Sequence, residues 1–348
     1  MTTTSWRRLI LLGGLAVPPA LASAQTNGFV LHCLSARAAS EGCVTRARDD
    51  VPTNLFHDPA SLSWFSQPAL EANLSSFMPS LTFRNSANAR VDGARHAYPM
   101  ASMAYVGPKV GSRWSWGIGL EPIGGFGSDF SLRHDLLGEG LDYESFFAAL
   151  KAGPAVSLDL LPGLSLGASA YLTYARINDF RMPFAMPPQA AAGMGMIVGM
   201  DEHYPGMFNG ATELTAYGDS RDFAGWGRGV SVGLGWRMDD LIRVSASWSP
   251  RSTITLDGAS ATIDMNRQFE AMFAVMVQER MMYHGMSAAE AQTSVAQALS
   301  SAGMDLALGT VARYDAATEL SEPQTAGVGM AIRLSPRWSV ALEGVWMD

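Results

Sequence analysis

The chain has 348 residues, a formal net charge of −8, and only 16% charged residues. This acidic balance argues against a nucleic-acid partner, which would favour a basic face. The chain also contains 35 glycines and nine tryptophans. After the N-terminus, no stretch is apolar for the roughly 20 residues that a transmembrane helix needs. The composition is therefore unusual for a water-soluble enzyme of this size.

The N-terminus has the pattern of an export signal. Arg7 and Arg8 supply a positive start, residues 9–17 a short apolar core, and residues 22–24 a small-residue cleavage site. We expect a signal peptide over residues 1–24 and a mature chain that begins near Gln25. A buried N-terminal helix is the alternative interpretation.

The two cysteines, Cys33 and Cys43, suit an oxidising compartment, in which they could close a small disulfide loop. The sequence leaves open whether they are bonded. Their spacing is not Cys-x-x-Cys, which argues against a redox-catalytic role. The six histidines form no pair at metal-ligand spacing, so we expect neither a metal nor a cofactor.

Period-two alternation is the strongest structural signal. After Pro162 and Gly163, residues Leu164 to Tyr174 place apolar side chains on one face and mainly Ser, Gly and Thr on the other. Soluble sandwiches alternate too, but here the apolar faces often end in Trp or Tyr, as an interfacial girdle requires. Short turns also alternate with long excursions over residues 178–221 and 258–322. These features predict an all-β, transmembrane antiparallel β-barrel of the bacterial outer membrane.

The predicted plan places an N-terminal plug at residues 25–66 and the barrel at residues 67–348. The sequence predicts nine strands, an odd number, whereas bacterial single-chain barrels close with an even number. We therefore expect a barrel that is incomplete at its C-terminus. The second long excursion is predicted to be helical, with a capping box from Ser287 to Glu290. The predicted strands lie near residues 69–79, 98–108, 113–130, 143–158, 163–178, 223–237, 241–257, 321–334 and 336–346.

One predicted strand breaks its own pattern. Alternation from Trp114 onward runs into Pro122 and then Gly124, Gly125 and Gly127. Proline cannot donate to a ladder and glycine permits a bulge. The segment is therefore either a kink that opens a gap in the wall or the outer end of the strand running into a loop.

The two long excursions are rich in methionine, a flexible and polarizable side chain that recurs on promiscuous binding surfaces. Met186 and Met194 lie in the first, and Met272 and Met276 in the second. These residues either form a groove that captures a hydrophobic ligand or pack loop helices together.

Several motifs, in order, resemble those of the FadL/TodX family of outer-membrane transporters for long-chain fatty acids and aromatic hydrocarbons. Asp58, where the family usually has Asn, is followed by Pro59 and Ala60 as in the family's plug segment. The other matching runs are Asn27-Gly28-Phe29-Val30-Leu31, Asp49-Asp50, Gly124-Gly125-Phe126-Gly127-Ser128-Asp129-Phe130, Tyr174-Ala175-Arg176 and Asp257-Gly258.

This resemblance implies a 14-stranded barrel with an N-terminal plug, in which outer loops capture a substrate that leaves sideways through a kinked strand. By that analogy Phe29 and Phe126 would bind substrate, and Gly124, Gly125 and Gly127 would form the lateral opening. Long-chain fatty acids are the first expectation and aromatic hydrocarbons the alternative. The oligomeric state is left open.

Arg176 is a candidate partner for a fatty-acid carboxylate. Its parity places it with Leu172 and Tyr174 on the lipid-facing side, where it would instead be an arginine that snorkels to the interface. Both interpretations remain open.

Two rival functions remain. A general porin would need a charged lumen, but the inward sets contain few charges. A lipid hydrolase would use Ser165, in a Gly-x-Ser-x-Gly pattern, or Ser220. A nucleophile elbow needs a strand-to-helix turn, whereas Ser165 lies inside an alternating strand, so we expect a transporter and not an enzyme.

Overall fold

The structure is a computed structural model that describes residues 34–186, 214–239, 241–301, 311–335 and 338–348. The helical elements are α2 (Ala36–Ser40), η2 (Pro52–Phe56), η3 (Pro59–Trp64), α5 (Asn266–His284) and α6 (Ala288–Ser301). The strands are β1 (Ala69–Phe77), β2 (Thr82–Phe83), β3 (Val91–Asp92), β4 (Tyr98–Val106), β5 (Trp114–His134), β6 (Gly138–Leu161), β7 (Leu164–Met186), β8 (Leu214–Met238), β9 (Ile242–Ser249), β10 (Ser252–Asp264), β11 (Val311–Glu322), β12 (Thr325–Ser335) and β13 (Trp338–Met347).

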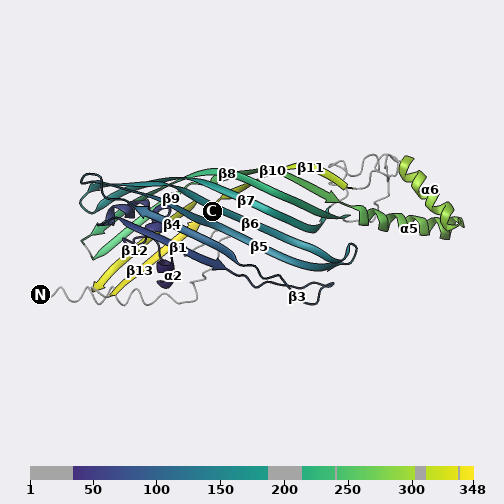
Figure 1. Cartoon of the computed structure of the whole chain (residues 1–348), viewed down its shortest axis with the longest axis horizontal. Helices are drawn as coiled ribbons and strands as arrows, with labels where there is room; N and C mark the ends of the chain where they lie inside the picture. The colour runs from purple at the N-terminus through teal and green to yellow at the C-terminus, as the bar shows by residue number, and fades with distance from the viewer. Residues whose placement is uncertain (1–33, 187–213, 240, 302–310, 336–337) are drawn as a thin grey trace.

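The main sheet has eleven strands in the described residues, in the order β1-β4-β5-β6-β7-β8-β9-β12-β13, with β10 paired to β8 and β11. Its strand pairs are antiparallel. Figure 1 shows the strands running along the long axis of the molecule, with α5 and α6 projecting beyond one end. The predicted all-β antiparallel architecture with a helical loop is confirmed.

The predicted strand over 241–257 is two strands, because the chain breaks at Pro250 and Arg251 between β9 and β10. Both halves lie beside β8, with Trp248 opposite Val232 and Ile254 opposite Gly227. A matching break between β11 and β12 contains Pro323, and proline has no amide hydrogen to donate to a ladder. The sheet is therefore nine strands wide, as predicted, although eleven separate strands form it.

The prediction that residues 258–322 form one long loop is wrong. β10 continues to Asp264, and β11 occupies the last part of that range. Between them α5 and α6 form the expected helical part, and no described helix is both long and apolar enough to cross a membrane. The capping box is confirmed: the Ser287 hydroxyl and amide both donate to Glu290 Oε2, at 2.7 and 2.9 Å.

The two faces of the sheet differ as the alternation predicts. Along β7, Leu166 and Leu172 are exposed on the outer face, whereas Ser165 and Thr173 are buried on the inner face. From Leu164 to Tyr174 the strand advances about 33 Å, which a barrel tilt of about 40° reduces to a height of about 25 Å. The apolar part of the outer face thus has the height of a membrane barrel's lipid-facing band.

The N-terminal residues 34–66, here called the inner segment, pack against the inner face of the sheet through η2 and η3, and the amide of Ala36 at the start of α2 donates to Asn73 of β1 at 3.1 Å. Leu55, Phe56 and Leu62 form a buried cluster with Val106 and Tyr171 of the wall. The Tyr171 ring meets the Phe56 ring edge-on, with centroids 5.5 Å apart. Apolar burial and aromatic packing therefore hold this segment inside the curled sheet.

Candidate functional site

The inner segment rests on a patch of small residues on β6, β7 and β8. The carbonyl of Ala60 accepts hydrogen bonds from the hydroxyls of Ser157 and Ser165, both at 3.1 Å. A Cβ placed on Gly167 would lie 2.2 Å from the carbonyl carbon of Pro59, so only glycine lets the two backbones approach this closely. Ser165 thus has a structural contact inside a strand.

Asp58 is completely buried between the inner segment and the wall. Its Oδ2 accepts a hydrogen bond of 3.0 Å from the amide of Ala47, whereas Oδ1 has no hydrogen-bond partner among the described residues. Burial raises the pKa of the Asp58 carboxyl, although the hydrogen bond from Ala47 opposes that shift. Burial thus shifts Asp58 toward its neutral form, which resembles in shape the asparagine that we expected from the family.

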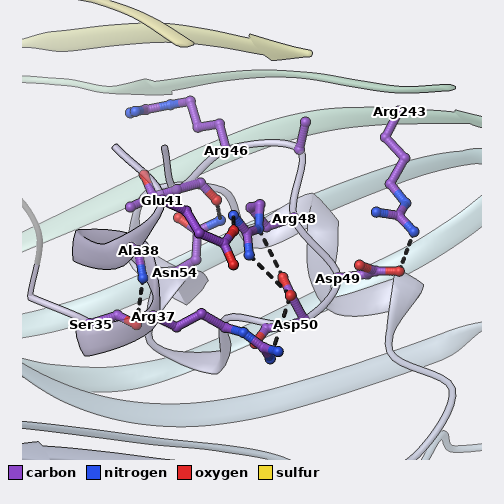
Figure 2. Close-up of polar contacts among 12 residues, drawn as sticks. Ser35, Arg37, Ala38, Glu41, Arg46, Arg48, Asp49, Asp50, Asn54 and Arg243 are labelled. Atoms are coloured by element: carbon purple, nitrogen blue, oxygen red, sulfur yellow. Dashed lines mark hydrogen bonds and ion pairs between the residues drawn. The ribbon is translucent and has the colours of Figure 1, made fainter. Parts of the chain in front are cut away.

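Ion pairs tie the inner segment to the wall and to itself (Figure 2). Asp49 pairs with Arg243 of β9, and Asp50 lies 2.8 Å from Arg48 and 3.4 Å from Arg37. Burial alone would raise the pKa of Asp50, but the hydrogen bond and charge of Arg48 outweigh it and hold that pKa below its usual value. Asp50 is therefore ionised at neutral pH.

Arg46 forms the most deeply buried of these contacts. Its guanidinium pairs with Glu343 of β13, and the two side chains are only 5% and 10% exposed. Arg46 Nε also donates to the Ser247 hydroxyl at 2.9 Å. A Cβ on Gly327 would lie 2.3 Å from Arg46 Cζ, so this glycine of β12 makes room for the guanidinium.

Sequence reasoning missed a second buried charge cluster. Lys151 of β6 lies 3.1 Å from Glu121 of β5 and 3.7 Å from Glu322 of β11. His57 of the inner segment lies 3.1 Å from the same Glu121 oxygen. The Lys151 ammonium also lies 4.9 Å from the centre of the Tyr171 ring, an arrangement typical of a cation–π contact.

The pairing of these charges determines what the interior offers to a ligand. The buried cations of the described residues are Arg46, Arg48, Lys151 and Arg243. Each is paired with at least one carboxylate. Within the described chain, the interior therefore has apolar and hydroxyl groups to offer but no buried cation that lacks a counter-ion.

The glycine-rich part of β5 lies within the strand. β5 continues to His134 and stays paired with β6, with a bulge between Pro122 and Gly124. The interpretation of this segment as a strand end running into a loop is wrong. Gly124, Gly125 and Gly127 all follow the bulge.

Next to this bulge, β5 loses one neighbour. β4 pairs with β5 only from Met103 opposite Leu120 to Val106 opposite Gly117. From Glu121 onward, the described part of β5 pairs with β6 but not with β4. Near this seam, a Cβ on Gly127 would lie 2.4 Å from the hydroxyl oxygen of Tyr98 on β4. We call the stretch from Glu121 to Ser128 the β4–β5 seam; beyond it, the amide of Ala94, in the segment before β4, donates to the carbonyl of Asp129 at 2.8 Å.

Other predicted site residues are scattered. Arg176 lies exposed on the outer face and pairs with Asp222 at 2.9 Å, as its parity predicted for the snorkelling interpretation. The backbone of Phe126 pairs with Phe147 in the sheet, and its side chain lies outside the described residues. Phe29 and Cys33 also lie outside them, whereas Cys43 is disulfide-bonded.

Two further expectations concern metals and loops. No group of three or more metal-ligating side chains occurs in the described parts of the chain.

Of the loop methionines, Met272 and Met276 pack against a cluster that contains Phe269 and Val295. Met194 lies outside the described residues. Packing between helices thus accounts for these two methionines of the second loop.

Comparison with known proteins identifies relatives. A sequence profile of the family described as outer membrane protein transport protein (OMPP1/FadL/TodX) matches residues 20–348. No curated protein sequence matches the chain.

Solved structures with the same fold share little sequence with this chain. The Ralstonia pickettii toluene transporter TbuX is 15% identical with a TM-score of 0.62, over 92% of this chain and 72% of that one. A Pseudomonas aeruginosa FadL homologue is 13% identical with a TM-score of 0.58, over 92% and 69%. The Pseudomonas putida toluene transporter TodX is 14% identical with a TM-score of 0.55, over 91% and 70%. The chain thus spans about two thirds of the length of the solved structures that it matches, and 65% of a TodX deltaS2S3 mutant.

Proposed function

Because the chain belongs to the OMPP1/FadL/TodX family of outer membrane proteins, we propose that it lets small hydrophobic molecules cross the outer membrane passively. One observation carries this proposal: the unpaired β4–β5 seam lies beside a segment that fills the inside of the sheet. Molecules would enter the sheet from the α5–α6 end and leave sideways through the seam. Such a route delivers an apolar solute into the apolar core of the bilayer without passing through water.

The inner segment supports sideways release because it blocks the straight path. Its contacts reach Glu71 of β1, Glu121 of β5, Arg243 of β9 and Glu343 of β13. We propose that residues 25–66 act as a plug and residues 67–348 as the barrel wall, with residues 1–24 as the export signal. The plug would be drawn toward the wall by buried ion pairs, which are costly to break one partner at a time.

We propose an uncharged substrate, such as a monoaromatic hydrocarbon, in preference to a fatty acid. A fatty-acid carboxylate that enters a low-dielectric interior needs a cation. The four buried cations of the described residues already have carboxylate partners. A neutral ring has no such need. Two of the structural relatives are toluene transporters, which accords with this choice.

The fatty-acid alternative rests on Lys151, which lies beside the rings of Phe56 and Tyr171. An incoming carboxylate would have to replace Glu322, the more distant of the two Lys151 partners at 3.7 Å. Uptake of labelled toluene and labelled palmitate by a host without its own transporters distinguishes the two substrates. Preferential uptake of palmitate would overturn the choice of an uncharged substrate.

The seam itself is tested with the combined change of Gly124, Gly125 and Gly127 to valine. The new side chains would clash, at Gly127 with the Tyr98 ring and at Gly125 with the carbonyl oxygen of Phe147. We expect uptake to fall about tenfold or more, the loss expected when a required passage is closed. Gly344→Val is the control, because a Cβ there meets only Val328, at 3.9 Å. Unchanged uptake by a folded triple variant would show that the seam is not the exit.

We propose no enzymatic activity. Ser165 hydrogen-bonds to carbonyl oxygens of Ala60 and Gly235, at 3.1 and 3.3 Å, so it is not presented as a nucleophile. The porin alternative predicts a large steady conductance in planar bilayers. A chain that works through the β4–β5 seam should instead conduct ions only weakly, and a porin-sized conductance would overturn the transport proposal.

A further inference from the structure

The outer face of the sheet carries a groove of about 620 Å³ that crosses β6, β7 and β8 and ends at the break between β9 and β10. It arises where the β6–β7 ladder is interrupted, between the pairs Ala152–Leu172 and Ala155–Ser169. Pro154 lies in this interruption and cannot donate a ladder hydrogen bond. The volume falls in the range of roughly 300–1,000 Å³ that ligand pockets have.

The groove faces the lipid and not the interior. Leu172 and Val230, on two of its sides, are 58% and 47% exposed, in contrast to the buried inner-face residues Thr173 and Ser231. Ala152 and Ala170 line it as well, and their small side chains leave the depression between larger neighbours. An apolar depression of this kind fits a hydrocarbon chain.

The groove lies near the membrane interface on the side of α5 and α6. Trp226 is one outward-facing position further along β8 toward those helices, and its ring lies 5.0 Å from that of Tyr174. Aromatic pairs of this kind mark the interface of a membrane barrel. The short turns that join β6 to β7 and β8 to β9 lie at the opposite end of the sheet, so this interface is that of the outer leaflet.

Arg228 lies at this end of the groove, opposite Leu172 in the β7–β8 ladder. It is exposed on the lipid-facing side, and no carboxylate of the described residues pairs with it. Its neighbours differ in this respect: Arg176 pairs with Asp222 and Arg251 with Asp348, at 2.9 and 2.7 Å. An arginine on the lipid face destabilises a barrel increasingly with depth. An anion from outside the described chain would therefore stabilise the charge of Arg228.

We propose that this groove binds lipopolysaccharide from the outer leaflet, with an acyl chain of its lipid A along the groove and a lipid A phosphate on Arg228. Guanidinium and phosphate match in charge and can form two parallel hydrogen bonds. The apolar groove, the unpaired cation and the height near the outer girdle together fit an anionic lipid of the outer leaflet. The site depends on the outer-membrane location and not on the proposed transport route.

Binding of purified lipid A to the folded protein in detergent tests the site, with native mass spectrometry as the readout. We expect bisphosphorylated lipid A to bind about tenfold or more tightly than dephosphorylated lipid A, because the charge-assisted contact is lost with the phosphate. Arg228→Gln should abolish this preference. Arg176→Gln, which removes an outward arginine that already has a carboxylate partner, should keep it.

A second variant separates the contribution of the acyl chain to lipid A binding from that of the phosphate. Ala170→Leu fills the groove without changing any charge, and it should weaken binding of both lipid A forms equally. Heat-modifiable migration confirms that each variant is folded, and Ala170→Leu carries the test if Arg228→Gln does not fold. An unchanged phosphate preference in Arg228→Gln, or unchanged binding in Ala170→Leu, would overturn the proposal. So would displacement of lipid A by equimolar oleate, which would make the groove a fatty-acid site.

Discussion

The imidazole Nε2 of His57 lies 3.1 Å from Oε1 of Glu121, and this contact joins the inner segment to the strand that carries the bulge. Glu121 is the last residue of β5 before Pro122, and it is also the first beyond the part that pairs with β4. The same oxygen contacts Lys151 at 3.1 Å. Movement of the inner segment would therefore act directly on the wall at the β4–β5 seam.

This relationship predicts the effect of Glu121→Gln. Lys151 would keep only Glu322, at 3.7 Å, and a buried charge that loses its partner costs about 3–5 kcal/mol. We expect a loss of that size in the free energy of unfolding, measured by urea titration in lipid vesicles with tryptophan fluorescence.

Two further variants control this measurement. Asp159→Asn breaks the exposed Lys109–Asp159 pair and should cost about 1 kcal/mol or less. Removing both charges, in Glu121→Gln with Lys151→Met, should cost less than Glu121→Gln alone. A double variant as unstable as the sum of its parts would show that the two charges do not interact.

Gly167→Ala tests the seat of the inner segment. Its new methyl would overlap the backbone of Pro59, and such overpacking costs about 1–3 kcal/mol. Because Pro59 belongs to the inner segment and not to the sheet, we expect the segment to shift while the barrel stays folded. Faster entry of a large antibiotic into cells would report the shift. In Gly344→Ala the new methyl would make only an ordinary contact with Val328, at 3.9 Å, and should leave entry unchanged. Equal entry for both variants would show that Gly167 does not position the inner segment.

The lipid-facing strands could be predicted because a membrane imposes apolar alternation on them. The missed strand shows where that signal ends. β11 alternates in burial along its whole length, but its exposed positions include Arg313, Asp315 and Glu319. Here exposed positions can be polar, as they are wherever a sheet faces water instead of lipid, and the apolar period disappears. A polar segment with hidden alternation is then indistinguishable from a loop.

The candidate site was predictable only in part. The alternation of side chains along the strand places Glu121 on the face that carries small residues. This position is the signal in the sequence for a charge that points into the barrel. The register that sets Glu121 opposite Lys151 depends on the bulge and turn of that hairpin, which the pattern of one strand does not specify. The approach of His57 depends on tertiary packing of a segment without regular period. Asp58 was recognised by resemblance, but its complete burial was not predictable from its neighbours.

The burial of Asp58 predicts that docking of the inner segment depends on pH. Burial raises its pKa, so the docked segment favours the neutral acid. The stabilising contribution of that neutral acid is complete below the ordinary aspartate pKa of about 3.9, and it is lost as the pH rises through the raised pKa of the docked state. We therefore expect planar-bilayer conductance to increase with pH. Asp58→Asn, which is neutral throughout, should give a flat profile; a variant that keeps the wild-type profile would assign the dependence to another group.

The Arg46–Glu343 pair predicts how firmly the inner segment is held. Glu343→Gln would leave the buried Arg46 guanidinium without its counter-ion, at a cost of about 3–5 kcal/mol. Arg46 and Arg48 are trypsin sites within the inner segment. Release of the segment can therefore be followed as the rate at which added trypsin cleaves there, in cells whose outer membrane has been permeabilised. We expect that rate to rise about 100-fold or more, since each 1.4 kcal/mol is a factor of ten when opening precedes cleavage. Asp348→Asn breaks a pair whose side chains are 55% and 50% exposed and should change the rate by less than about fivefold. Similar cleavage rates in the two variants would mean that Glu343 does not hold the segment in place.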